Sequence, residues 1–196
     1  MPRAVILRGC GVELVERARL LVDEQGVAIT VALGSPFDRH AGSGATWDLA
    51  SNALRPAGWT SADAAGLPIL PGLVRYDEVA AGAIRHALRF TTNRTRTSYL
   101  YPARHQAGSS SSSSLPPMGL RVRLKASYDT SSFSPQARVI AVALQRYGMI
   151  LADNGSPWYI SGMSDPRFDD DVLHELDVIT GRDLEVVDTA GLLNGP

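Results

Sequence analysis

The sequence predicts an α+β fold in which a β-rich, sandwich-like (jelly-roll-like) sheet is accompanied by a few helices. Three observations favour this class. Several short segments alternate between apolar and polar residues, as half-buried strands do. Few segments carry the spacing of an amphipathic helix, and Gly, Pro, Asn and Ser gather between the periodic segments. The chain has 196 residues, of which 44% are hydrophobic, so one domain with a packed core is expected.

The N-terminal third is predicted to contain a helix, a strand and a long connection. Residues 12–24 place valines and leucines near one helical face and are followed by a glycine that suits the helix end. The apolar run at 27–33 predicts a strand. Residues 34–72 are rich in Gly, Pro, Ser and Ala and predict a long loop, which Trp47 and Trp59 would hold against the protein surface.

The middle of the chain is predicted to form a hairpin and a flexible loop. Residues 84–92 alternate in polarity and predict a strand with His86 on its apolar side. Residues 93–97 are polar and suit the connection, and residues 99–101 would be the returning strand. The Gly/Ser run at 108–114, with its six consecutive serines, predicts a flexible loop.

The C-terminal half is predicted to alternate between strands and helices. Ser134 as the N-cap and Pro135 at the first helical position begin a helix that ends near Gly148. Asn154 and Gly155 form a turn signal between two strands. Strands are expected at residues 120–126, 149–152, 158–161 and 184–187, and a short acidic helix at residues 169–177.

Charge, cysteine content and missing motifs exclude several classes of function. Nineteen basic and twenty acidic residues leave a net charge of -1, which argues against a general nucleic-acid binder. No apolar run approaches the length of a membrane span. Cys10 is the one cysteine, so an intramolecular disulfide and a multi-cysteine zinc site are excluded. The phosphate-loop, GxGxxG, HExxH and GxSxG motifs are absent, which disfavours nucleotide enzymes, zincins and α/β-hydrolases.

Three carboxylates and two histidines are the candidate catalytic residues. Asp77, Glu78 and Asp153 could supply the acid/base pair that glycosidic cleavage requires. His86 and His105 could assist as general bases. Structural roles stay open for each: a helix cap for Asp77, a turn for Asp153, a hydrogen-bonded core position for His86 and an exposed loop for His105. No spacing is diagnostic of a metal site, and no cofactor is expected.

Arginines and aromatic residues are the candidate binding residues. Two predicted strands carry basic residues on one face: Arg85 and Arg89 on the first, and Arg121, Arg123 and Lys125 on the second. Together they could form a positive stripe that binds carboxylate or sulfate groups, or simply a solvated sheet face. Aromatic side chains near the Asn154–Gly155 turn could form a platform for a sugar ring or belong to the core. The predicted substrate-binding residues are Arg89, Tyr101, Arg104, Asn154, Trp158 and Tyr159.

Four segments carry a resemblance to a known family: AGSGATWDLASNALRPAGWTSADAAGLPILPGLVRYDEVAAGAIRHALRFT, YPARH, PPMGLRVRLKASYD and QRYGMILADNGSPWYISG. They resemble a family of mostly secreted bacterial proteins of the actinobacterial type, to which no activity is assigned. The likeness runs from Ala41 to Leu193, roughly three quarters of the chain. It implies an extracellular setting, often beside carbohydrate-related modules, and transfers no catalytic residue.

The first forty residues depart from the family pattern. They lack the export signal that the resemblance implies, which suggests a misassigned or truncated start. We therefore expect an atypical segment over residues 1–40, followed by a single β-rich domain over residues 41–196.

Two functions of different classes follow from these features. The first is an extracellular-type protein that acts on polysaccharide by glycosidic cleavage. The alternative is a non-catalytic carbohydrate- or surface-binding module, and a structural fragment is a third. The expected partner is a polysaccharide rather than nucleic acid or a membrane. An enzyme should gather ionisable groups with shifted pKa values in one pocket, whereas a binding module should present an aromatic platform.

Overall fold

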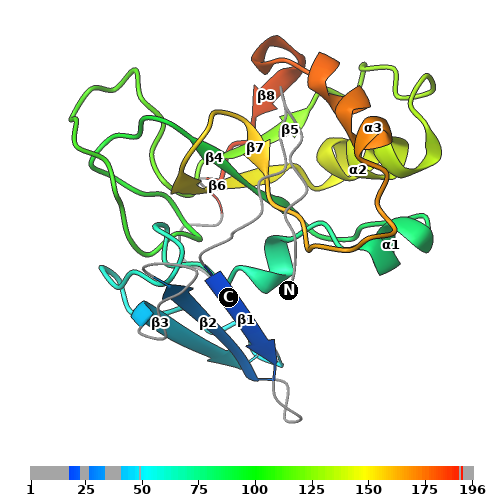
Figure 1. The fold of residues 1–196 in the computed structure, drawn as a ribbon. Helices are drawn as coiled ribbons and strands as arrows, with labels where there is room; N and C mark the ends of the chain where they lie inside the picture. The colour runs from blue at the N-terminus through cyan, green and yellow to red at the C-terminus, as the bar shows by residue number, and fades with distance from the viewer. Residues whose placement is uncertain (1–17, 23–26, 34–40, 49, 190, 192–196) are drawn as a thin grey trace.

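The structure, a computed structural model, describes residues 18–22, 27–33, 41–48, 50–189 and 191. Two sheets and a group of short helices make up this part of the chain (Figure 1). The α+β class is confirmed, whereas a sandwich-like packing of the jelly-roll kind is not and stays a prediction. The strands are β1 (Ala18–Val22), β2 (Val27–Leu33), β3 (Ala41–Asp48), β4 (Leu88–Thr92), β5 (Arg121–Leu124), β6 (Met149–Asn154), β7 (Tyr159–Ile160) and β8 (Leu184–Val186). The helices are α1 (Tyr76–Ala80), α2 (Pro135–Arg146) and α3 (Asp170–Leu173), with 3-10 turns η1 (Leu70–Gly72), η2 (His174–Val178) and η3 (Gly181–Asp183).

The smaller sheet is antiparallel, in the order β1-β2-β3, and lies at the lower left of Figure 1. The helix predicted over residues 12–24 is wrong where the chain is described, because residues 18–22 form β1 and pair with β2. A short apolar run is compatible with the periodicity of a helix or of a strand, and pairing with β2 stabilises the strand here. The rest of that predicted helix, and the glycine after it, lie outside the described residues. The strand predicted at 27–33 is confirmed as β2.

The connection predicted over residues 34–72 contains regular structure. Residues 41–48 form β3, which pairs along its length with β2, so one sheet spans the expected boundary between residues 40 and 41. The division of the chain at that boundary stays a prediction.

The larger sheet has the order β7-β4-β6-β5-β8. Its middle strand is β6, and the neighbouring strand β4 runs parallel to β6 and antiparallel to β7. The predicted strand 84–92 is shortened to residues 88–92, so His86 precedes the strand instead of lying on it. Arg89 and Thr91 are buried together with Leu88 and Phe90, because an interior strand that is covered on both faces buries both sets of side chains.

The hairpin predicted after residues 84–92 is wrong, whereas the Asn154–Gly155 signal does lie between two strands, as predicted. The second of these strands, β7, pairs with β4, which separates it from β6. Residues 99–101 do not return as a strand beside β4; Tyr99 forms a single isolated bridge with Met118. The serine run lies in a loop, as predicted. Local turn signals could not reveal these pairings, because β4 finds its neighbours about sixty residues further along the chain.

The helices gather on the right of the large sheet in Figure 1, where α1 and α3 each contact α2. The predicted start of α2 at Pro135 is confirmed, although the Ser134 hydroxyl donates to Glu175 rather than capping the helix. Gly148 follows the helix with a φ of 70°, and a Cβ there would lie 2.3 Å from the Val122 carbonyl oxygen. This backbone conformation and close approach explain why a glycine ends the helix.

The predicted acidic helix and the last strand are also confirmed. Asp169 caps α3 by accepting hydrogen bonds from two backbone N–H groups of its first turn, and β8 pairs with β5. The core lies between α2 and the large sheet, with Ile140 and Leu144 of the helix fully buried. Within the described part of the chain, no helix has the length and apolar character needed to cross a membrane.

Candidate functional site

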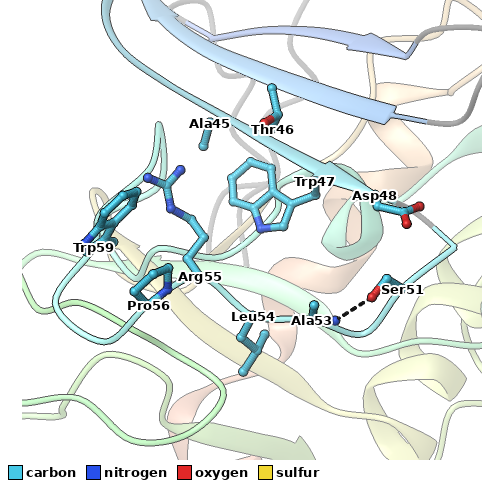
Figure 2. Close-up of a pocket in the computed structure, with 10 residues that line it drawn as sticks. All are labelled: Ala45, Thr46, Trp47, Asp48, Ser51, Ala53, Leu54, Arg55, Pro56 and Trp59. Carbon is cyan, nitrogen blue, oxygen red and sulfur yellow. Dashed lines mark hydrogen bonds between the residues drawn. The ribbon is translucent and has the colours of Figure 1, made fainter.

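An open pocket lies between the C-terminal end of β3 and the segment that follows it, residues 51–59 (Figure 2). Its volume is about 570 Å³. The alternation of β3 places Trp47 inward with 7% of its surface exposed, whereas Thr46 and Asp48 face solvent. Trp59 lies on the opposite side of the pocket and is 56% exposed. The pocket is therefore bounded by one anchored indole and one exposed indole.

Arg55 extends between these two tryptophans. Its guanidinium carbon lies 5.7 Å from the centre of the Trp47 ring and 5.3 Å from the centre of the Trp59 ring. Both distances are within the range of a cation–π interaction, which fixes a guanidinium over an aromatic face. Figure 2 shows the two terminal nitrogens pointing away from the segment that carries the residue. The arrangement presents a positive charge between two apolar surfaces.

The polar atoms of this pocket are incompletely paired within the described part of the protein. The structure gives the Arg55 side chain no ion pair there, and both Arg55 Nε and Trp47 Nε1 are buried without a hydrogen-bond partner. The nearby carboxylate of Asp48 accepts a hydrogen bond of 2.8 Å from the Ala50 N–H and points away from Arg55 in Figure 2. A buried donor without an acceptor costs about 1–3 kcal/mol.

Arg104 fixes the segment that carries Arg55. Its Nε donates to the Arg55 carbonyl oxygen at 2.8 Å, and its own carbonyl accepts from the Gly58 N–H at 2.6 Å. Its backbone N–H donates to the Ala65 carbonyl at 2.8 Å. Gly66 has a φ of 72°, and a Cβ there would lie 2.4 Å from the Trp59 carbonyl oxygen. Arg104 was predicted to hold the substrate; the structure places it behind the pocket wall.

A cluster of polar side chains is buried elsewhere, where β4, β6 and β7 meet the turn around Asp63. Arg89 donates from Nε and Nη2 to Asp63 Oδ2 at 3.3 and 3.2 Å, and from Nη1 to the Ser161 hydroxyl. Asp63 Oδ1 accepts from the Ala65 N–H at 3.2 Å. The predicted residues Arg89 and Asp153 therefore lie in one electrostatic cluster with Asp63, which sequence reasoning missed.

Burial raises the pKa of Asp63 to about 7, against the opposing effect of the Arg89 guanidinium, and the second carboxylate of Asp153 adds to the rise. Burial likewise raises the pKa of Asp153, which Arg89 opposes. Two carboxyl groups share one guanidinium here, so the neutral arrangement has one of them protonated. Asp63 is completely covered, so a proton on Asp63 is out of reach of a polymeric substrate, whereas Asp153 is half-buried.

The predicted carboxylates Asp77 and Glu78 lie on α1, and both are paired. Glu78 accepts from Arg75 at 2.7 Å and lies 3.1 Å from His86 Nε2. Partial burial raises the pKa of Glu78, but the hydrogen bonds from Arg75 and His86 outweigh it and the net shift is downward. Asp77 is exposed and accepts from Arg167 at 2.9 Å. A lowered pKa suits an ion pair rather than a general acid.

The predicted catalytic residues do not come together in one hollow. His86 precedes the N-terminal end of β4, whereas Asn154 pairs with Thr92 at its C-terminal end. A strand rises about 3.3 Å per residue, so roughly 13 Å separates the two ends of β4. His105 lies on the side of Asp153: its Nδ1 is 3.0 Å from the carbonyl oxygen of Ala64, whose backbone N–H donates to Asp153. Of the predicted set, Arg89 and His105 are therefore near Asp153, whereas Glu78 and His86 form a separate pair.

The aromatic residues predicted to form a platform for a sugar ring pack against other parts of the protein instead. Trp158 stacks on Phe90, with ring centres 5.5 Å apart, and packs against the core. Tyr159 belongs to β7 and, like Tyr101, is half-buried. Asn154 accepts from the Thr95 hydroxyl at 3.0 Å and donates to the Ala107 carbonyl at 2.9 Å, so it fastens two loops.

The predicted basic stripe is likewise not assembled as a free surface. Arg89 points into the buried cluster, Arg121 donates to the Tyr147 carbonyl, and Arg123 pairs with Glu185 at 2.6 Å. Lys125 donates to the Arg182 carbonyl at 2.6 Å. These contacts favour the interpretation of a solvated sheet face with local partners.

Sequence signals for the missed residues exist but are weak. Asp63 is the only charged residue between Arg55 and Arg75, and a lone charge in an apolar stretch is typical of a buried, paired group. Arg55 lies between two tryptophans in the sequence, at eight and four residues' distance, but that spacing specifies no geometry in a loop.

The described residues include no group of three or more His, Cys, Asp or Glu side chains placed to hold a metal ion. The resemblance to secreted bacterial proteins stays an expectation, and the pocket and the buried cluster are the observations from which a function can be inferred. Comparison of the chain with protein-family models, with curated proteins and with solved structures finds no match.

Proposed function

We propose that this protein is a carbohydrate-binding module that holds polysaccharide in the pocket formed by Trp47, Arg55 and Trp59. The single observation that carries the proposal is the exposed indole of Trp59 facing an anchored indole across a guanidinium. An exposed indole that borders a pocket offers an apolar surface that a ligand can cover. The extracellular setting implied by the family resemblance is compatible with this function.

The chemistry of sugars matches this pocket. One face of a pyranose ring carries mainly C–H groups, which pack on an indole face and meet its negative π surface. The hydroxyl and ring oxygens at the edge of the sugar accept hydrogen bonds, and Arg55 presents donors there. Indole rings and a guanidinium held by neighbouring rings lose little conformational freedom on binding, which favours affinity.

Glycosidic cleavage, the other predicted function, has weaker support. The carboxyl group with the clearest acid character, Asp63, is covered by protein, and Glu78 is held as an ion pair. Neither lines the Trp47–Arg55–Trp59 pocket. Cleavage stays a prediction that the same experiment examines.

The test is a panel of insoluble and soluble polysaccharides on which retention of the whole protein and release of reducing ends are both measured. We expect retention on at least one polymer without release of reducing ends. Replacing Trp59 by Ala should weaken retention roughly twofold to tenfold, the range expected for loss of one aromatic stacking contact. Tyr99→Ala is the matched control, because Tyr99 is an exposed aromatic residue outside the pocket.

Two outcomes would contradict the proposal. Failure of the wild-type protein to bind any polymer of the panel would remove it, and so would equal retention of the Trp59→Ala protein and the wild type. Release of reducing ends that is abolished by Glu78→Gln or Asp153→Asn would establish the enzyme instead.

A further inference from the structure

From the geometry of Arg55 we infer that the preferred ligand is a polysaccharide with carboxylate groups on its sugar units, such as a polyuronate. This inference rests on the proposed function and adds the class of ligand. Its basis is a cation held between two rings, with no ion pair to it in the described part of the chain.

The first step is the contrast with the arginines that the structure pairs with a carboxylate. Arg75, Arg89 and Arg123 each meet a carboxylate of the chain at 3.2 Å or less. Arg167 meets two. The partners of Arg55 are aromatic faces instead, and because its Nε is buried, the two terminal nitrogens are the donors left to meet a ligand. A ligand that enters the pocket can accept from these terminal N–H groups.

The second step is the shape of the ligand group. A carboxylate is planar and accepts two parallel N–H bonds in the plane of a guanidinium. The guanidinium carbon lies within 5.7 Å of both indole ring centres, so a sugar ring that stacks on Trp59 can bring its carboxylate to Arg55.

The third step is the desolvation of the charge. The Arg55 Nε atom is buried, and Trp47 covers one side of the guanidinium with a side chain that is only 7% exposed. Water screens an ion pair less where apolar groups exclude it, so a carboxylate here gains more than it would at an open surface.

Asp48 gives a way to change the charge of the pocket without touching Arg55. It lines the pocket, and its carboxylate accepts the Ala50 N–H. In Asp48→Asn the side-chain oxygen can still accept this bond, while one negative charge that repels an acidic polymer is removed. This variant should bind an acidic polymer more tightly.

The experiment compares retention of the whole protein on polygalacturonate, on its fully methyl-esterified form and on dextran sulfate. The first two share a backbone and differ in charge. We expect about tenfold stronger retention on the free acid than on the ester, the gain of one charge-assisted bidentate contact. At about 1 M salt, where the Debye length falls to about 3 Å, part of this preference should persist because the contact is partly desolvated.

Three variants complete the design. Arg55→Gln should abolish the preference for the free acid over the ester. Arg55→Lys should also lose most of it, because an ammonium group keeps the charge but not the planar fork. Asp48→Asn should increase retention on the free acid severalfold and leave retention on the ester unaltered.

The outcomes separate this inference from the proposed function. Equal retention on acid and ester, with loss of both in Trp59→Ala, would overturn the carboxylate assignment and keep carbohydrate binding. Equal or stronger retention on dextran sulfate, or full preference in Arg55→Lys, would indicate general attraction of anions and would also overturn it. Absence of retention on every polymer would remove the proposed function itself.

Discussion

Arg89 and Arg55 are placed in contrasting surroundings by the same chain. Arg89 projects from the interior strand β4, is 6% exposed, and directs its donors to Asp63 and Ser161. Arg55 projects from the connection after β3 and lies between two indole rings. The protein satisfies the hydrogen bonds of the first and leaves those of the second to other partners.

The contrast shows that losing a buried, ion-paired arginine and losing an arginine that borders a pocket should have different effects. Removing a charge from water is costly, so a buried guanidinium is retained only with carboxylates around it, and its loss leaves those carboxylates uncompensated. A guanidinium held by aromatic faces keeps its donors available, and its loss exposes little. The first arginine should therefore matter for folding and the second for binding.

The largest expected effect is that of Arg89→Met. It leaves Asp63 and Asp153 buried without their counter-charge, and we expect a loss of about 3–5 kcal/mol in the free energy of unfolding, measured by urea denaturation. The double variant Arg89→Met with Asp63→Leu should recover much of the loss, because it removes the uncompensated charge as well. A loss below about 1 kcal/mol in the single variant would show that the cluster does not stabilise the fold.

The pH dependence of stability tests the same cluster next. The pKa of Asp63 is raised from its ordinary value of 3.8 to about 7, so the folded protein keeps a proton that the unfolded chain has already lost. The free energy of unfolding should therefore fall as the pH rises between about 4 and 7, by up to about 1.4 kcal/mol for each pH unit. Asp63→Asn should remove this component, which a comparison of urea midpoints for the two proteins would reveal. Parallel curves for the two proteins would contradict the raised pKa.

Ser161→Ala sharpens the comparison from the side of Arg89. It removes the hydroxyl that accepts from Arg89 Nη1 and leaves a buried donor unpaired, so we expect a loss of about 1.5 kcal/mol. Thermal unfolding measures it, and Thr46→Ala, an exposed hydroxyl residue on β3, is the control. Equal unfolding temperatures for the two variants would show that the hydroxyl contributes nothing.

The smallest expected effect on stability is that of Arg55→Ala. Two cation–π contacts are lost, but the Arg55 carbonyl still accepts from Arg104, so the free energy of unfolding should change by less than about 1 kcal/mol. The same protein should lose retention on polygalacturonate. A destabilisation as large as that of Arg89→Met would place Arg55 among the residues that hold the fold.

Elements with strong local signals could be predicted from the sequence. Proline at the first turn and a glycine with positive φ after the last turn delimit α2, and the alternation of Val122 and Leu124 with polar residues marks β5. The start of β4 could not be predicted, because its alternation extends upstream to residues that join no strand. Its neighbours β6 and β7 also depend on contacts far along the chain.

The candidate site was predicted less well than the fold, for a related reason. Arg89 and Asp153 were singled out, but as separate residues of a substrate cleft, whereas burial joins them to Asp63. Trp47 and Trp59 were expected to fasten the long connection to the protein, and the position of Arg55 between them was not foreseen. Residues in a loop have no fixed period, so their spacing in the sequence does not tell which side chains meet.

By itself, the sequence determined the α+β class, the limits of α2, the strands β2, β5 and β8, and the near-neutral charge. These follow from local conformational preference and composition, which act over a few residues. Only the tertiary structure decided that β4 lies between β7 and β6, that Arg89 is paired with a buried carboxylate, and that Arg55 lies between two indoles. Such placements depend on the burial of groups distant in the chain, and the electrostatic cost of burial decides which charges are paired and which stay available.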